Sequence, residues 1–325
     1  MKRLLAVIIV ATLAYSGWWF YAAHDLRSSI ENWFSDQRAS GLQVNYADLS
    51  IVGFPNRTDL TITEPVISAS DKGFGWQAPF LQILGLSYKK GHVIVAWPDT
   101  QYLTTDQGNI AVTSDGLRAS VVHDNGTIMR SNLVAIVLNM TGPDRTIALA
   151  EVNAALQQIE IAPLSYRLAL SVGSIATTSP QITTNIGPES LGSLRAELEV
   201  TLDRPLTFSV MEGVAPQPTE ITIKRSEITY GSVTFKVSGT ASLDPQGLAT
   251  GEITIAAENW QDAVAAARDN GDLPPGLSDS LIDILSMLST LSGTREALDV
   301  TLGLDRSTIL IGPIPVGKLP PLRWR

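Results

Sequence analysis

The sequence contains no cysteine and only three histidines, His24, His92 and His123. Disulfide bonds, thiol nucleophiles, Cys-ligated zinc and iron–sulfur clusters are therefore excluded. The lack of cysteine is compatible with an oxidising periplasm, where an unpaired thiol is a hazard, but it does not identify that compartment. Three imidazoles also leave little material for acid–base catalysis.

The familiar catalytic motifs are missing too. No nucleophile elbow, Walker loop, His-Glu-x-x-His or dinucleotide fingerprint occurs. Residues 87–90 (Ser-Tyr-Lys-Lys) formally match Ser-x-x-Lys, but the partner motifs Ser-Asp-Asn and Lys-Thr-Gly do not occur. His92 beside an apolar strand and His123 beside a turn favour structural or surface roles. We expect no catalytic residue, no cofactor and no metal ligand, and hence a protein that is not an enzyme.

Charged residues are scarce, at 17% of the chain, and 23 Lys+Arg against 32 Asp+Glu give a net charge of −9. A general nucleic-acid binder needs a basic surface, so we expect no nucleic-acid partner. The same balance disfavours electrostatic adhesion to anionic lipid headgroups. Hydrophobic residues make up 44%, which is enough to bury a sizeable core.

The N-terminal segment predicts a membrane anchor. Lys2 and Arg3 precede an uncharged apolar stretch from Leu4 to Ala23. At about 1.5 Å per residue it matches the ~30 Å of a bilayer core, and the aromatic run 18–21 at its far end suits a membrane–water boundary. The two basic residues favour an N-inside orientation. We therefore predict a cytoplasmic tail at 1–3, a transmembrane anchor at 4–23 and the rest of the chain outside the cytoplasm.

A cleaved signal peptide is the alternative interpretation of this segment. Ala14-Tyr15-Ser16 places small residues at the two positions that signal peptidase reads. Cleavage there would leave the Trp-Trp-Phe-Tyr run at a new terminus with no evident burial, so we favour the retained anchor. Both interpretations predict export.

Residues 24–41 are predicted to continue as a juxtamembrane helix that ends at Gly41. Apolar and long side chains recur at helical spacing, and we expect this helix to dock on the following domain rather than to act as a sensor or coiled coil. The positions are Leu26, Ile30, Trp33, Phe34 and Gln37.

From Leu42 onward the pattern changes to a period of two, which is typical of antiparallel strands with one apolar and one wet face. Two continuous apolar runs, 93–97 and 133–138, predict strands covered on both faces. The fold class is therefore mainly β: a curved antiparallel sheet, or a sandwich or trough, with a few helices and one N-terminal transmembrane helix. Residues 42–325 form a β-rich periplasmic domain, with a division near 160–165 as an alternative. The clearest alternating segments are 166–172, 194–202, 233–238 and 298–304.

Turn and cap signals fall between the strands. Asp244-Pro245-Gln246-Gly247, residues 124–126 and residues 114–116 predict turns, and Asp305-Arg306 predicts a solvated tip. A helical island is predicted at 259–292, with Asn259 capping its first helix and a second helix at 278–291 carrying a leucine stripe.

Three short stretches carry a family resemblance: residues 53–57 (Gly-Phe-Pro-Asn-Arg), residues 239–260, and residues 311–322. With the N-terminal anchor, this arrangement resembles the bacterial envelope family called domain of unknown function 2125 (DUF2125), and more distantly the AsmA-like proteins. The AsmA-like resemblance implies an elongated β fold and a role in phospholipid transfer or outer-membrane homeostasis, without an active site. This chain is much shorter than the bridge-forming members, which argues against a membrane-to-membrane conduit.

These observations lead to two functional hypotheses that we favour over a third, an enzyme with a cleft of clustered polar side chains. The first is a periplasmic protein, anchored in the inner membrane by a single pass, that binds or helps handle lipid, with phospholipid as its partner. The second is a structural or protein-interaction module of the cell envelope, with other envelope proteins as partners. For the first, we predict an apolar trough covered by the leucine stripe, while ordinary core packing of the same residues remains open. The predicted trough residues are Val233, Phe235, Val237, Leu281, Leu285 and Leu288.

Overall fold

The computed structural model describes residues 1–69, 73–178, 192–212, 215–231, 233–261 and 297–324. The chain forms two compact units. Unit 1 comprises Met1–His123 and Leu133–Thr146, and unit 2 comprises Asp124–Asn132 and Ile147–Arg325.

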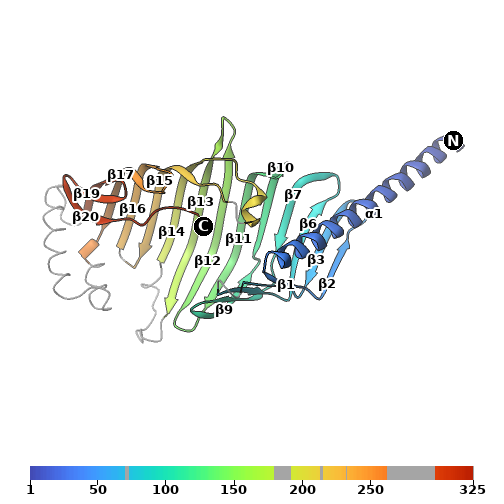
Figure 1. The fold of residues 1–325 in the computed structure, drawn as a ribbon, viewed down its shortest axis with the longest axis horizontal. Helices are drawn as coiled ribbons and strands as arrows, with labels where there is room; N and C mark the ends of the chain where they lie inside the picture. Colours follow the sequence, from blue (N-terminus) through green and yellow to red (C-terminus); the bar gives the residue numbers. More distant parts are fainter. Residues whose placement is uncertain (70–72, 179–191, 213–214, 232, 262–296, 325) are drawn as a thin grey trace. The chain divides into compact units, whose positions relative to one another are not determined.

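One uninterrupted helix, α1 (Lys2–Ala39), covers both the predicted anchor and the predicted juxtamembrane helix. No proline occurs within it, so nothing in the sequence forces a break between its two parts. The helix ends just before Gly41, whose φ of 95° suits a residue without a side chain, as predicted. Figure 1 shows the N-terminal part of α1 projecting beyond the strands of unit 1.

Unit 1 consists of α1 and two antiparallel arrays of strands. The first array runs in the spatial order β2, β3, β6, β7, β10, and the second in the order β1, β4, β5, β8, β9, β11. The last residue of β10 and the first part of β11 belong to unit 2. The bounds are β1 (Gln43–Asn45), β2 (Asp48–Val52), β3 (Arg57–Thr63), β4 (Val66–Ala69), β5 (Phe74–Gln77), β6 (Phe80–Leu86), β7 (Lys89–Ala96), β8 (Thr100–Thr105), β9 (Gly108–Asp115), β10 (Arg118–Asp124) and β11 (Thr127–Thr141).

The core of unit 1 is shared by the helix and both arrays. Phe34 of α1 packs in one buried cluster with Val44 of β1, Leu49 of β2, and Leu60 and Ile62 of β3. Ile30, one turn before Phe34, and Trp33, the residue just before it, pack against this cluster. The prediction that the second part of the helix docks on the domain is therefore confirmed.

Unit 2 is an antiparallel meander in which each strand from β13 to β20 pairs with the next (Figure 1). The bounds are β12 (Thr146–Ile159), β13 (Ala162–Thr178), β14 (Gly192–Leu202), the 3-10 helix η3 (Phe208–Glu212), β15 (Pro218–Tyr230), β16 (Val233–Leu243), β17 (Ala249–Glu258), β18 (Ala297–Asp305), β19 (Thr308–Ile311) and β20 (Ile314–Lys318).

The predicted fold class is confirmed: the chain is mainly antiparallel sheet behind one N-terminal apolar helix, and the sheet is open rather than a closed barrel. The expectation that residues 93–97 and 133–138 are covered on both faces is wrong. Ile94 is 38% exposed and Ile136 62% exposed. Successive side chains of a strand point to opposite faces whatever their polarity, and at these two positions the second face stays open to solvent.

Several predicted turns are confirmed. Residues 244–248 join β16 to β17, and Asp244 Oδ1 accepts hydrogen bonds from the backbone N–H groups of Gln246 and Leu248. At the β18–β19 turn Arg306 is exposed as predicted, while the adjacent Ser307 is wholly buried. Of the predicted helical island, only Trp260 and Gln261 are described as helical, and residues 262–296 lie outside the described residues.

Candidate functional site: an apolar sheet face and the base of the helix

One face of the unit 2 sheet is made of apolar side chains and is here called the apolar face. The register places alternate apolar residues of each strand from β13 to β18 opposite those of the next strand. Directly opposite residues point to the same side of a sheet, so they line up in rows across the strands. One row is Leu168, Leu198, Ile223, Gly239, Ile253 and Leu302, and another is Val172, Leu194, Ile228, Phe235 and Ala257.

A β-bulge in β15 keeps the apolar face continuous. The register shifts between Ile223 and Ser226, where Lys224 and Arg225 together oppose a single residue of β16. Ile223 and Ile228 are five positions apart, so in a regular strand they would point to opposite faces. The extra residue of the bulge returns Ile228 to the side of Ile223.

The apolar face is buried along one margin and half-buried in the middle. At the margin, Tyr166 and Val200 are buried beneath Leu206, and Leu304 is buried beneath Leu319. In the middle, the apolar residues of the first row named above are only half-buried. In the second row Val172 and Ala257 are buried, while Phe235 is half-buried and Ile228 is 44% exposed. Apolar surface therefore remains accessible at the centre of this face.

The predicted trough residues of β16 lie on this face. Val233 is buried, and Phe235 and Val237 are half-buried on the same side of the strand. The register places them opposite Ala257 and Ile255 of β17. The three predicted covering residues, Leu281, Leu285 and Leu288, lie outside the described residues, so a ligand role for the six stays a prediction.

The opposite face of the same strands is charged. Glu199 accepts hydrogen bonds from Lys224, with an Nζ–Oε1 distance of 3.0 Å, and from Arg167, with an Nη2–Oε1 distance of 3.1 Å. These hydrogen bonds, together with the positive charges of the two side chains, lower the pKa of the Glu199 carboxyl. Lys236 donates to Glu258 at 2.6 Å, which raises the pKa of the lysine. The sheet is thus amphipathic across its thickness.

Two shallow pockets of unit 2 are lined by polar side chains. One, of about 420 Å³, lies at the bulge between Lys224, Glu227 and Lys236, and the other, of about 280 Å³, lies between Glu151 and Arg195. Within the described ranges, no three His, Asp or Glu side chains are grouped so that they could hold a metal ion. Both pockets suit water and ions better than an apolar ligand.

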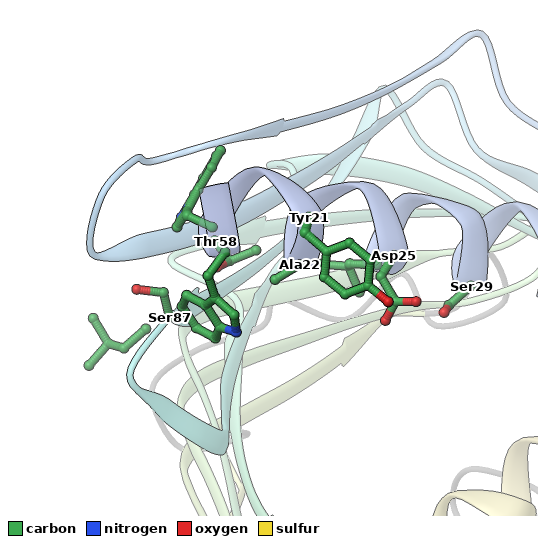
Figure 2. Close-up of a pocket in the computed structure, with 10 residues that line it drawn as sticks. Tyr21, Ala22, Asp25, Ser29, Thr58 and Ser87 are labelled. Carbon is green, nitrogen blue, oxygen red and sulfur yellow. The ribbon is translucent and has the colours of Figure 1, made fainter. Parts of the chain in front are cut away.

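In unit 1, a pocket of about 370 Å³ lies where α1 meets the strands. Figure 2 shows Tyr21, Ala22, Asp25 and Ser29 spaced along α1. Thr58 of β3 and Ser87, which directly follows β6, also line the pocket. The spacing of three to four residues places one stripe of the helix on this pocket. Aromatic rings beside a carboxylate and hydroxyls suit a boundary between apolar and aqueous surroundings.

Hydrogen bonds from the apolar part of α1 were not foreseen from the sequence. The Tyr15 hydroxyl donates to the carbonyl of Pro55 at 2.8 Å, and its oxygen lies 3.0 Å from Ser87 Oγ. The Trp19 indole donates to the carbonyl of Arg57 at 2.9 Å and is only 4% exposed. The sequence indicated an aromatic run at 18–21 and marked residues 53–57 as part of a family resemblance, but nothing in either segment identifies the other as its partner.

Comparison with known proteins gives one match. The family model described as "Uncharacterized protein conserved in bacteria (DUF2125)" matches residues 19–320. No curated protein and no solved structure matches the chain. The resemblance to DUF2125 is thereby confirmed, while the more distant AsmA-like resemblance stays a prediction.

Proposed function

The chain belongs to the DUF2125 family of uncharacterised bacterial proteins, and from that premise we propose that it is a non-enzymatic, membrane-anchored protein of the cell envelope that binds or helps handle lipid. The apolar face of unit 2 is the surface that takes the lipid. The inner membrane holds the anchor, and the bulk of the chain lies in the periplasm.

The anchor is supported by the length and composition of α1. The helix is long and apolar enough to cross a membrane. Leu4, Val10 and Leu13 are about two-thirds exposed, so the strands of unit 1 do not bury this part of the helix. A lipid environment is where such side chains are stable. Lys2 and Arg3 at its start support the orientation with the bulk of the chain outside the cytoplasm.

The lipid ligand is supported by a single observation, the continuous and half-buried apolar face. None of the described residues in its two rows is charged. Next to the bulge, the polar Ser226 lies opposite Val237 on this face. An acyl chain has no hydrogen-bonding groups and gains about 25 cal/mol for each Å² of apolar surface that it covers. A surface that is apolar over six strands suits a long, flexible chain better than a compact polar ligand.

The test is photo-crosslinking of the full-length protein in nanodiscs that contain a phospholipid with a diazirine on its acyl chain. Lipid adducts are mapped by mass spectrometry, which separates those on α1 from those on unit 2. We expect adducts on β13–β18 in addition to α1. The variant Ile228→Glu places a charge on the apolar face and should reduce the unit 2 adducts at least about tenfold, because burying a charge beside an acyl chain costs several kcal/mol.

Ser238→Glu is the matched control. Ser238 lies on β16, on the opposite face of the sheet, and is exposed. The Ser238→Glu substitution adds the same charge near Ile228 but should leave the adduct yield unchanged. Adducts confined to α1 in the native protein would contradict lipid binding by unit 2.

The structural or protein-interaction role is the second candidate, and β20 favours it. All five residues of β20 are exposed, and Ile314 and Val316 present apolar side chains to solvent at 62% and 54% exposure. Exposed strands of this kind can pair with a strand of another protein. If unit 2 carries no lipid adduct, crosslinking from position 316 is the experiment that tests this candidate.

A further inference from the structure

The apolar part of α1 is joined to two particular hairpin tips of unit 1. Residues 53–56 connect β2 to β3, and Ser87 and Tyr88 connect β6 to β7. Because β3 pairs with β6 with Arg57 opposite Leu86, the two tips are neighbours. Ser87 N donates to Asn56 O at 3.1 Å, and Ser87 Oγ to Pro55 O at 3.1 Å, so the tips are also hydrogen-bonded to each other.

The contacts to the helix fall inside its apolar stretch. Tyr15 and Trp19 donate to the carbonyls of Pro55 and Arg57. The ring of Phe20 stacks on that of Phe54 with a centroid distance of 5.6 Å and an interplanar angle of 13°. Trp19 meets the same Phe54 ring edge-on at 5.5 Å. These three helix residues belong to the segment from Leu4 to Ala23 that has the composition of a membrane span.

The position of these contacts along α1 fixes the depth of the tips. From Tyr15 to Ala23 the helix rises about 12 Å, at 1.5 Å per residue. The headgroup layer on one side of a bilayer is roughly 5–8 Å thick. If α1 spans the membrane up to Ala23, a tip bonded to Tyr15 and Trp19 lies at the level of that layer or deeper, and not in the water outside it.

The chemistry of the tips suits this depth. Four side chains in the tips or at the strand ends next to them, here called the collar, are apolar or aromatic and exposed. One of them, Leu86, lines a pocket together with the exposed Trp18 and Tyr21 of the helix. Lys89, at the start of β7, is exposed and can reach a lipid phosphate. Aromatic and amphipathic side chains are enriched at the membrane–water interface. The collar consists of Val52 (59% exposed), Phe54 (46%), Leu86 (38%) and Tyr88 (69%).

We propose that the collar inserts into the interface of the membrane that α1 crosses, at or just below its headgroups, as a second attachment site that fixes unit 1 against the bilayer. This inference rests on the proposed membrane span of α1. The occupant is the phospholipid interface, because the tips contact the segment of the chain that lipid must surround. A partner protein on the same surface would have to compete with that lipid.

The test uses the lack of cysteine, which lets single cysteines be labelled without background. Full-length Val52→Cys and Tyr88→Cys variants, each carrying a nitroxide, are reconstituted in vesicles of phosphatidylethanolamine and phosphatidylglycerol. Both sites avoid Phe54 and leave its stacking intact. Collisions with oxygen, which enters the bilayer, and with a water-soluble nickel chelate are then compared by power saturation. We expect oxygen collisions to dominate at positions 52 and 88.

Two further labels separate the possible outcomes. Phe74→Cys is the matched control, since Phe74 is 47% exposed in the same unit but lies on β5 of the second strand array, whereas the tips join strands of the first. It should collide mainly with the nickel chelate. Val7→Cys reports the span itself and should be inaccessible to the chelate. Suppose that position 7 is protected from the chelate while positions 52 and 88 are as accessible to it as position 74. The collar then does not insert into the membrane, and the membrane span of α1 still stands. If position 7 is also accessible to the chelate, both the span and the collar are wrong.

Discussion

The indole N–H of Trp19 donates a 2.9 Å hydrogen bond to the backbone carbonyl of Arg57, 38 residues further along the chain. Trp19 therefore belongs to the packed structure of unit 1 as well as to the apolar stretch of α1. Its neighbour Trp18 is 39% exposed. The two adjacent tryptophans thus have different roles, and each can be tested.

Trp19→Phe should destabilise unit 1 by about 0.5–1.5 kcal/mol, because it removes the hydrogen bond to Arg57 while keeping an aromatic ring. Trp18→Phe is the matched control and should change stability by less than about 0.5 kcal/mol. Thermal unfolding of the full-length protein in detergent, followed by circular dichroism, measures both. Equal effects of the two substitutions would contradict the structural role of Trp19.

Phe34→Ala should cost about 3–5 kcal/mol, because Phe34 is 2% exposed and fills the core that α1 shares with both strand arrays. The measurement is urea unfolding in detergent. Phe74→Ala removes the same ring from an exposed position and should cost less than about 1 kcal/mol. A small effect at Phe34 would mean that the helix does not depend on this contact.

Gly239→Ala should disrupt the β16–β17 pairing. The φ of Gly239 is 150°, and a Cβ there would lie 2.7 Å from the Cα of Ile253 in the facing backbone. Neither strand can move aside without breaking the ladder, so we expect a loss of at least about 2 kcal/mol.

Gly303→Ala provides the comparison for this prediction. A Cβ at Gly303, on β18, would meet Leu310 Cβ at an ordinary 3.5 Å. Its effect should stay within about 1 kcal/mol. Hydrogen exchange of the β16–β17 amides checks that the larger loss at Gly239 is local to that pairing.

Tyr166→Phe should destabilise unit 2 by about 1–2 kcal/mol. The Tyr166 hydroxyl, in a side chain only 1% exposed, accepts a 3.1 Å hydrogen bond from the backbone N–H of Leu206, which the variant leaves unpaired. Tyr102→Phe, at a 45% exposed position, should have little effect. Denaturant unfolding compares the two variants, and an unchanged midpoint for Tyr166→Phe would contradict the prediction.

The carboxyl of Glu199 should titrate below its ordinary pKa of 4.5, because Lys224 and Arg167 donate hydrogen bonds to it. A depressed pKa means that its contribution to stability is present above pH 4.5 and is lost as the pH falls through the folded-state pKa. NMR titration of the carboxyl carbon measures the value. Lys224→Met should raise the pKa toward 4.5, whereas Lys89→Met, in the other unit, should not change it.

Much of the fold could be predicted because its signals are local. The helical period at Ile30, Trp33 and Phe34 correctly indicated docking, and the alternation in 233–238 correctly indicated which side chains of β16 share a face. The bulge at Lys224-Arg225 could not be predicted, because one extra residue is recognised only against the partner strand. The same limit applies to Ile136, whose exposure depends on what covers the second face of its strand.

Some features of the candidate site could likewise be predicted from the sequence, and others could not. The sequence identified Val233, Phe235 and Val237 as apolar neighbours on one strand face, but not the rows that continue through Leu198, Ile223 and Ile253. It also identified the aromatic run at 18–21 and the Gly-Phe-Pro-Asn-Arg stretch at 53–57 without linking them. Such links join residues far apart in the chain, and a local pattern carries no information about which distant segment will be opposite.

By itself, the sequence determined an apolar helix of membrane-spanning length, strands with one apolar side, and the turns between them, because each of these follows from side-chain size and polarity at short spacing. Only the tertiary structure decided that Tyr15 and Trp19 bind the 53–57 turn, and that the strand faces of unit 2 align into one apolar surface. Register and long-range contact depend on how all strands pair at once, and that is a property of the folded chain as a whole.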